Sequence, residues 1–274
     1  MMKKYNCFSV LCLAAAMAFT ACTQDELTDD TLPEGKYPLE IASAAIEAES
    51  SVQPWGAQSP QTRVYEDPMS DTNSAWETGD EFYVKFQDSD EVGTYKITAS
   101  YNGTTAAVTP VYWQSANTEQ TIIAWYAPDA DADGKLDLSD QSKGIIYAMR
   151  AETKATYNNT SGAVSLKFGH QLAKVRVIFS GATSKVNEVT INGYTSCTVT
   201  EGTVTADTQP GNIIMWQSPR QNNIFEATVV PDCEITTVKV NGIPATLNQT
   251  ITPEIGKYYK ITITVQEASG TGAE

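Results

Sequence analysis

The chain has 274 residues, of which 33 are acidic and 18 basic, so its formal charge at pH 7 is −15. An acidic surface of this kind repels nucleic acid and anionic lipid head groups, so we expect no nucleic-acid partner. The sequence contains a single histidine, His170, which excludes a histidine-rich zinc site and a histidine-bridged metal pair.

The first 21 residues have the organisation of an export signal. Two lysines precede an apolar run over residues 8–19, and small residues stand before Cys22. The apolar run is too short to span a bilayer. We therefore predict a lipoprotein signal peptide over residues 1–21 and a lipid on Cys22. The alternative is an ordinary cleaved signal followed by a chance cysteine.

Residues 22–36 are polar and acidic, and they predict a flexible tether because they cannot bury enough apolar surface to fold. Without the two lysines of the leader, 16 basic and 33 acidic residues give the exported chain a formal charge of −17. Solubility outside the cell is the simplest role for this charge.

The body of the chain consists of short runs in which apolar and polar residues alternate, as on the two faces of a strand. The clearest runs are residues 82–86, 94–98, 164–168, 175–179 and 258–265. Turn dipeptides stand between them, at Asn102-Gly103, Asp133-Gly134, Asn192-Gly193 and Asn241-Gly242. No segment of the body shows a helical apolar period, so the sequence predicts an all-β protein.

About 240 residues fit one large β-sandwich or two small ones. We favour two, an N-terminal domain over residues 37–181 and a C-terminal domain over residues 182–274. The soft, linker-like stretch at residues 180–184 places the boundary.

The sequence gives little support to catalysis. His170 shares one face of an extended run with Leu166, Phe168 and Leu172, which favours a structural histidine over a member of a catalytic triad. The sequence contains no Gly-rich phosphate loop, no Gly-x-Ser-x-Gly elbow and no His-Glu-x-x-His motif. We expect no enzyme and no required cofactor.

One acidic stretch, residues 129–140, has the spacing of a calcium loop. Carboxylates at its first, third and fifth positions are followed by Gly134, which permits the bend that would aim oxygens at a hard cation. The candidate ligands are Asp129, Asp131, Asp133, Lys135 through its carbonyl, Asp137 and Asp140. The alternative is a solvated acidic turn between strands at residues 122–127 and 144–149.

Two cysteines, Cys197 and Cys233, remain after Cys22. An oxidising compartment would permit them to form a disulfide, and two buried free thiols are the alternative.

A series of segments, in order along nearly the whole chain, resembles the fimbrillin-like lipoproteins of Bacteroides-type bacteria, whose members are similar to the subunits of type V pili. The segments are residues 32–41, 60–64, 76–80, 111–114, 124–128, 139–144, 166–175 and 256–263, which read LPEGKYPLEI, PQTRV, WETGD, VYWQ, AWYAP, SDQSKG, LKFGHQLAKV and GKYYKITI.

The resemblance implies two β-sandwich domains of transthyretin-like shape and export as a lipoprotein. It also implies removal of the N-terminal strand by an arginine-specific protease at the cell surface, after which a strand of a neighbouring subunit fills the open groove. The acidic tether resembles the signal that sends such lipoproteins to the outer face of the outer membrane.

These expectations can be placed on particular residues. Tyr37, Leu39 and Ile41 alternate as in a first strand, over residues 37–48, and Arg63 is the first arginine of the chain. Cleavage between Arg63 and Val64 would release that strand together with the lipid, unless Arg63 is simply a loop arginine. The candidate donor strand carries Tyr259, Ile261, Ile263 and Val265, and the polar tail after it is unsuited to serve as a second donor.

We therefore predict a structural or adhesive pilus subunit, with other pilus subunits as partners. Its precursor would be held by lipid on the outer membrane, and the processed chain would reside in the fimbrium. The alternative is a monomeric surface lipoprotein that completes its own fold and binds a glycan or host ligand. Exposed tryptophans would support the alternative, but all five serve equally well as core: Trp55, Trp76, Trp113, Trp125 and Trp216.

Overall fold

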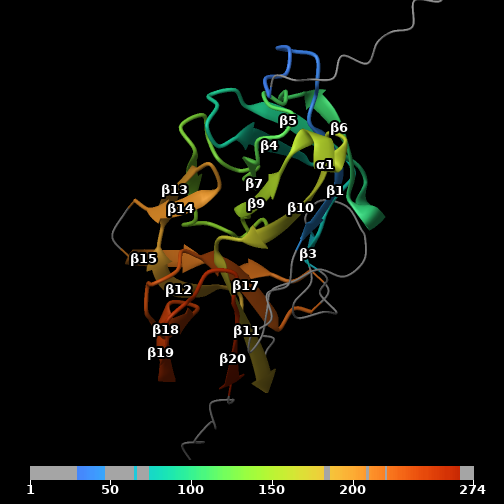
Figure 1. Ribbon diagram of the computed structural model, residues 1–274. Helices are drawn as coiled ribbons and strands as arrows, with labels where there is room; N and C mark the ends of the chain where they lie inside the picture. The colour runs from blue at the N-terminus through green and yellow to red at the C-terminus, as the bar shows by residue number, and fades with distance from the viewer. Residues whose placement is uncertain are drawn as a thin grey trace, which may run out of the picture.

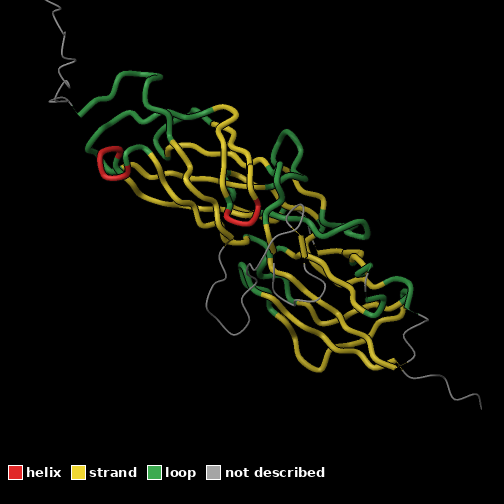
Figure 2. The backbone as a smooth tube through the Cα atoms, turned by 90° about the vertical axis from the view of Figure 1, so that its right-hand side faces the viewer, coloured by secondary structure: helices red, strands yellow, loops and turns green. Residues whose placement is uncertain are grey.

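The computed structural model describes residues 30–46, 65–66, 74–181, 186–207, 210–219 and 221–265. The regular secondary structure of these residues is almost entirely strand, with one four-residue helix, α1 (Tyr157–Thr160), and one 3-10 turn, η1 (Ser100–Asn102). The molecule is elongated, with two groups of strands arranged along its long axis (Figures 1 and 2). The all-β prediction is confirmed.

The N-terminal group is a seven-stranded sheet in the order β1-β10-β9-β7-β4-β5-β6. All neighbours in it are antiparallel except β1 and β10, which are parallel. Its strands are β1 (Glu40–Ile46), β4 (Glu81–Phe86), β5 (Gly93–Ala99), β6 (Thr104–Thr109), β7 (Gln120–Tyr126), β9 (Met149–Ala155) and β10 (Ala163–His170). A separate two-stranded sheet, β2 (Tyr65–Glu66) and β3 (Ser74–Ala75), precedes β4 in the sequence.

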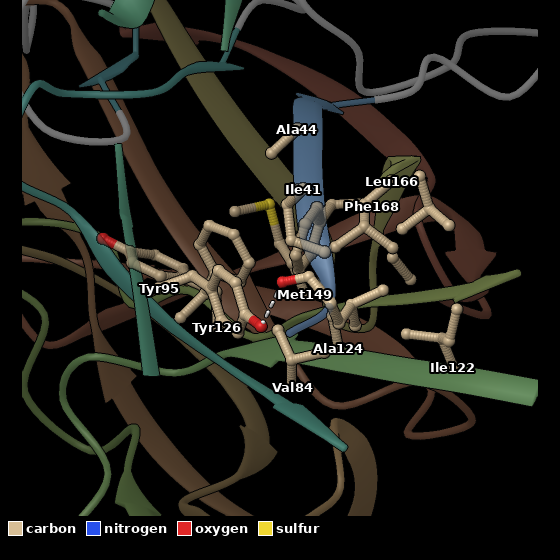
Figure 3. Packing of buried hydrophobic residues seen from close by; sticks show 14 of the residues in the cluster. Ile41, Ala44, Val84, Tyr95, Ile122, Ala124, Tyr126, Met149, Leu166 and Phe168 are labelled. Atoms are coloured by element: carbon tan, nitrogen blue, oxygen red, sulfur yellow. Dashed lines mark hydrogen bonds between the residues drawn. The ribbon is translucent and has the colours of Figure 1, made fainter. Parts of the chain in front are cut away.

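Alternating residues of these strands form the first apolar core. Phe82 and Val84 of β4 and Leu166 and Phe168 of β10 are fully buried. The Trp76 ring meets the rings of Tyr126 and Phe168 edge to face, with centroids 5.1 Å apart in both pairs. Figure 3 shows Ile41 and Ala44 of β1 in the same cluster. Burial of this aromatic and aliphatic surface is the main stabilising term for the N-terminal group.

The C-terminal group consists of two four-stranded sheets, β16-β17-β11-β20 and β15-β12-β18-β19. Their inner faces share the second apolar core, which includes Val177 and Phe179 of β11 and Ile191 of β12. The strands are β11 (Ala173–Gly181), β12 (Val189–Tyr194), β15 (Pro210–Ile214), β16 (Trp216–Gln217), β17 (Ile224–Val229), β18 (Ile235–Val240), β19 (Ile243–Ile251) and β20 (Tyr258–Val265).

A third sheet joins the two groups. Strand β8 (Lys135–Asp137), in the long connection between β7 and β9, pairs with β13 (Ser196–Thr200), which pairs with β14 (Thr203–Ala206). Gln141, in the same connection, donates to the carbonyl of Thr228 at 2.7 Å and accepts its N–H at 2.9 Å. The two groups therefore share hydrogen bonds as well as apolar contact.

Strand β11 bears on where the two domains divide. Its inward side chains already belong to the second core, whereas β10, two residues before it, belongs to the first. The boundary predicted after Gly181 falls at the end of β11. The distribution of buried residues favours a division at the β10–β11 turn.

Two local predictions were wrong. The Asn192-Gly193 pair lies inside β12, where Gly193 faces Gly211 of β15. A side chain at Gly193 would place its Cβ 2.7 Å from Ile213 Cδ1, so this glycine serves close packing and not a turn. Residues 144–148 form no strand, and their carbonyls bond irregular partners: Ile146 accepts from Thr228 Oγ1 and Ala148 from Gln171 N.

Candidate functional site

Strand β1 is the first strand of the seven-stranded sheet, and it also contacts β6 at the opposite end of that sheet. On one side it pairs in parallel with β10, from Glu40 with Ala163 to Ile46 with Phe168. On the other side it contacts the β5–β6 connection and β6: Ala44 N–H donates to the Gly103 carbonyl at 2.8 Å, and Thr105 Oγ1 donates to the Ile41 carbonyl at 2.6 Å. Removing β1 would therefore open a groove bounded by β10 and β6.

The inward-facing apolar side chains of β1 are almost fully buried. Ile41, Ala44 and Ile46 are 6%, 1% and 7% exposed. The strict alternation is interrupted, since the register shifts between Ile41 and Ser43. Such a bulge keeps Ile41 and Ala44 on the same inner face although three positions separate them. The predicted first strand over residues 37–48 corresponds to β1 at 40–46.

The segment before β1 pairs with a second stretch, residues 111–116. Leu32 N–H donates to the Gln114 carbonyl at 2.9 Å, Trp113 N–H to the Tyr37 carbonyl at 2.9 Å, and Leu39 N–H to the Val111 carbonyl at 2.8 Å. Leu32 and Leu39 are buried. Residues 30–46 together, which we call the N-terminal segment, thus run along the N-terminal sheet and contribute apolar side chains over their whole length.

Polar contacts fix both ends of residues 30–39, the part of the N-terminal segment that precedes β1. The Asp30 carboxylate accepts from the Thr118 hydroxyl and from Asn117 N–H, the latter at 2.9 Å, and these hydrogen bonds lower the pKa of Asp30. The buried Tyr95 hydroxyl donates to the Leu39 carbonyl at 2.8 Å. Burial raises the pKa of Tyr95 to about 12, so this donor stays protonated.

Gly103 allows the close approach of β1 to the β5–β6 turn. Its φ is +63°, and a Cβ there would lie 1.8 Å from the Ala44 carbonyl oxygen. Only glycine meets both conditions. Sequence reasoning identified Asn102-Gly103 as a turn but missed the contact with β1, because the two segments are more than 50 residues apart.

The candidate donor strand occupies an edge of its own sheet. Strand β20 pairs in parallel with β11, from Tyr258 with Lys174 to Val265 with Gly181. Ile261 is 6% exposed, while Tyr259, Ile263 and Val265 are half-buried against the second core. Its predicted bounds, residues 258–265, agree with the strand in the structure.

Several predicted residues lie outside the described residues. These are the lipidation candidate Cys22 and the cleavage candidates Arg63 and Val64. The described chain stops at Ile46 and resumes at Tyr65, so the predicted cleavage point falls between the N-terminal segment and the rest of the molecule.

The acidic loop at residues 129–140 does not bring its carboxylates together. Asp131 Oδ1 accepts the N–H groups of Asp133 and Lys135, both at 2.9 Å, while Asp137 and Asp140 accept from Ser139 and Ser142. These hydrogen bonds lower the pKa of Asp137 and of Asp140. In the described part of the chain, no three His, Cys, Asp or Glu side chains converge as metal ligands would. The geometry corresponds to the acidic-turn alternative.

Of the two cysteine alternatives, the structure has the free thiols. Cys197 and Cys233 are both buried and neither forms a disulfide. Burial raises the pKa of Cys197 to about 12 and also raises the pKa of Cys233. Such thiols are poor nucleophiles and behave as small apolar side chains.

His170 lies at the end of β10 and is 3% exposed. Burial, and secondarily the Lys174 charge, lower its pKa to about 3, so the imidazole is neutral near pH 7. Beside it, Glu226 Oε1 binds Lys174 Nζ at 3.1 Å and Arg176 Nε at 2.5 Å, all three residues being buried. Sequence reasoning missed this ionic cluster, because the alternation in β11 placed both cations on a solvent face.

The fold is that of an all-β sandwich protein whose first strand, β1, pairs with β10 and contacts β6. Residues 62–274 match the fimbrillin-like family, and the chain belongs to that family. The family match supports a role as a pilus or adhesin subunit.

Solved structures support the same fold. The chain is similar to a candidate cell adhesion protein of Bacteroides uniformis, with 20% identity, a TM-score of 0.53, and coverage of 69% of this chain and 88% of that one. It is also similar to a candidate cell adhesion protein of Bacteroides ovatus, with 12% identity, a TM-score of 0.53, and coverage of 83% and 91%. Among curated proteins, none matches the chain. The helices found in the described residues are too short and too polar to cross a membrane.

Proposed function

We propose that this chain is exported as a surface lipoprotein and assembles with other pilus subunits by strand exchange after cleavage at Arg63. The observation that carries this proposal is the placement of β1. The strand is deeply buried between β10 and β6, and it is connected to the rest of the chain only through residues 47–64, which include Arg63. The family match, which begins at residue 62, covers the body that cleavage would leave.

The energetics favour refilling of the groove. Four large side chains of the N-terminal segment are buried, Leu32, Leu39, Ile41 and Ile46. At about 1.5–3 kcal/mol each, their loss would cost roughly 6–12 kcal/mol, which approaches the whole stability of a typical domain. The emptied groove would also expose the backbone groups of β10. A strand from a neighbouring subunit would restore both kinds of contact.

The lipid on Cys22 would hold the precursor at the outer membrane until the N-terminal segment is removed. Because Cys22 precedes Arg63, one cut would discard the anchor and the strand together. The processed chain would then reside in the fimbrium. No catalytic step is part of this function, which agrees with the neutral, buried state of His170.

The test is limited digestion with an arginine-specific protease, followed by mass spectrometry and size-exclusion chromatography. We expect one early cut between Arg63 and Val64, release of the N-terminal segment, and growth of oligomers. The Arg63→Gln variant is the matched control and should remain intact and monomeric. A bond at Arg63 that resists the protease, or a cut chain that stays monomeric after losing the segment, would contradict the proposal.

A second candidate is a monomeric surface protein that does not polymerise. The observation in its favour is that β20 completes the chain's own sheet, pairing with β11 over its whole length. In this case the groove would stay filled by β1, and the chain would serve as a terminal or accessory subunit, or act alone in binding a host or glycan ligand. The same digestion distinguishes the two candidates, since only the first predicts oligomers.

A further inference from the structure

A row of side chains crosses the outer face of the N-terminal sheet. Strand pairing places Thr94 of β5 beside Tyr83 of β4, Tyr83 beside Trp125 of β7, Trp125 beside Arg150 of β9, and Arg150 beside Gly169 of β10. Neighbouring strands are about 4.8 Å apart, so the row extends for roughly 19 Å across the sheet. Two aromatic rings therefore stand at its centre, with polar groups on either side.

The aromatic pair is not part of any apolar core. Trp76 and Trp113 are buried and Trp216 packs against the first core, so Trp125 is the one described tryptophan that belongs to no apolar cluster. Tyr83 is 46% exposed and is the only aromatic residue among the described large apolar side chains that are exposed. The two ring centroids are 5.5 Å apart and the planes are inclined by 31°. The two tilted rings pack against each other, and the turn at Gly202 lies over the base of Trp125 and Arg150.

The charged groups around the pair are already neutralised. Arg150 Nη2 binds Glu152 at 2.7 Å and its Nε donates to the Glu201 carbonyl at 3.2 Å. Lys85 Nζ binds the Glu201 carboxylate at 2.5 Å. Arg150 is thereby held in place at the edge of the aromatic surface, where its remaining N–H groups can donate. A ligand gains no net charge attraction here, and the acidic chain as a whole disfavours an anion.

The size of the surface also limits the classes of ligand that it can bind. A stable protein interface needs about 800 Å² per partner with an apolar centre, whereas the apolar part of this surface is two rings framed by ion pairs. A pyranose ring suits it better, because its C–H faces can stack on an aromatic plane while its hydroxyls meet polar groups. Gly169, beside Arg150, leaves open space where a further sugar unit could lie.

We propose that Tyr83, Trp125 and Arg150 form a binding platform for a neutral oligosaccharide lying across the strands. Tyr83 and Trp125 together provide the aromatic surface on which a sugar ring stacks. The Arg150 guanidinium and the Thr94 hydroxyl contact sugar hydroxyls at the two ends of the row. The platform is independent of strand exchange, since its residues come from β4, β5, β7 and β9, and in the sheet order none of these strands pairs with β1.

The experiment measures binding of oligosaccharides to the purified chain by calorimetry and tryptophan fluorescence. The probes are cellohexaose, laminarihexaose, mannohexaose and xylohexaose, with hexagalacturonate as the acidic probe. We expect at least one neutral probe to bind at millimolar concentration or below. Trp125→Ala and Tyr83→Ala should each weaken that binding about tenfold or more, as loss of a stacking ring does.

Conservative variants separate stacking from folding. Trp125→Phe and Tyr83→Phe keep a ring and should retain binding within a few-fold. Val108→Ala removes another exposed apolar side chain, on β6, and should leave binding unchanged. Circular dichroism checks that each variant is folded. If Trp125→Ala does not fold, Tyr83→Ala, which changes an exposed residue, still tests the proposal. The proposal is overturned if no neutral probe binds, if only the acidic probe binds, or if folded alanine variants bind as the wild type does.

Discussion

The first and last strands of the described chain occupy equivalent positions but are held very differently. Strand β1 pairs in parallel with β10, and β20 pairs in parallel with β11, the next strand along the chain. Strand β1 is enclosed on both sides and its inward-facing apolar residues are at most 7% exposed. Strand β20 has one pairing partner, and Ile263 and Val265 at its far end are half-buried.

This difference matters for strand exchange. A deeply enclosed strand leaves a groove that strongly favours refilling, whereas a strand at an open edge costs less to detach. Under the proposed assembly, the N-terminal half has the properties of a good acceptor and β20 those of a donor that is only moderately attached. The exchange would then be driven by the excess of apolar burial in the acceptor groove.

Both edges use the same device for close approach. A Cβ at Gly103 would lie 1.8 Å from the Ala44 carbonyl of β1, and a Cβ at Gly181 would lie 2.3 Å from the Val265 carbonyl of β20. The two halves therefore differ in how much of the terminal strand they bury. In both halves a glycine allows the strand to approach closely.

Deletion of each strand should give the largest effects. A chain beginning at Val64 lacks the whole N-terminal segment and should lose the first core, at a cost of roughly 6–12 kcal/mol. A chain ending at Lys257 loses the buried side chains of Tyr258 and Ile261, at a cost of about 3–6 kcal/mol. Urea unfolding measures both. A synthetic peptide of residues 30–46 should restore the first variant, and its failure to do so would contradict the groove.

Single substitutions sharpen the same contrast. Ile41→Ala removes a buried side chain from β1 and should lower the free energy of unfolding by about 2–5 kcal/mol. Ile263→Ala, on the half-buried part of β20, should cost about 1 kcal/mol. Val108→Ala, at an exposed position on β6, is the control and should cost almost nothing. Equal losses of unfolding free energy for the two isoleucine variants, measured by urea unfolding, would show that β1 and β20 are held equally strongly.

The joint between the halves should respond to acid. His170 has a pKa of about 3 in the folded protein and about 6.5 when unfolded. The stability due to its neutral form is complete above about pH 6.5 and is lost as the pH falls towards 3, because only the unfolded state takes up the proton. At pH 5 the loss is about 2 kcal/mol. His170→Gln should lack this component of the unfolding free energy measured against pH.

Tryptophan fluorescence reports mainly on the half that contains β1, which holds the buried Trp76 and Trp113, and far-ultraviolet dichroism reports on both halves. Coincident acid transitions by the two probes are expected, since His170 stands between the first core and β11. If the wild type and His170→Gln lose the same free energy of unfolding between pH 6.5 and 4, His170 is not held neutral by burial.

The sequence predicted local structure better than pairing. Alternation located β4, β5, β10, β11 and β20, and Asn241-Gly242 forms the predicted turn with both φ angles positive, at 50° and 80°. Alternation shows which side chains share a face, but it does not show which strand lies beside which. The parallel partner of β1 is more than 100 residues away, and this pairing creates the candidate site.

Buried charge was the second limit of sequence reasoning. Lys174 and Arg176 alternate with Val175 and Val177, a pattern typical of a strand with one solvent face. They are nevertheless at most 1% exposed, because Glu226 on the neighbouring β17 pairs with both and Tyr258 of β20 lies close, its ring centroid 5.7 Å from the Arg176 guanidinium. Burial of such a face depends on tertiary contacts that a single strand's pattern does not contain.

Calcium should have the smallest effect. Asp131 accepts two backbone N–H groups of its own turn, and Asp137 and Asp140 each accept one, from Ser139 and Ser142. A cation would have to break these hydrogen bonds before it gained any ligand. We therefore expect millimolar calcium to leave the melting temperature unchanged. The loop leads into β8, which pairs with β13 of the other half, so bound calcium would raise the transitions of both halves together. Such a joint rise, abolished in Asp131→Ala, would restore the calcium interpretation.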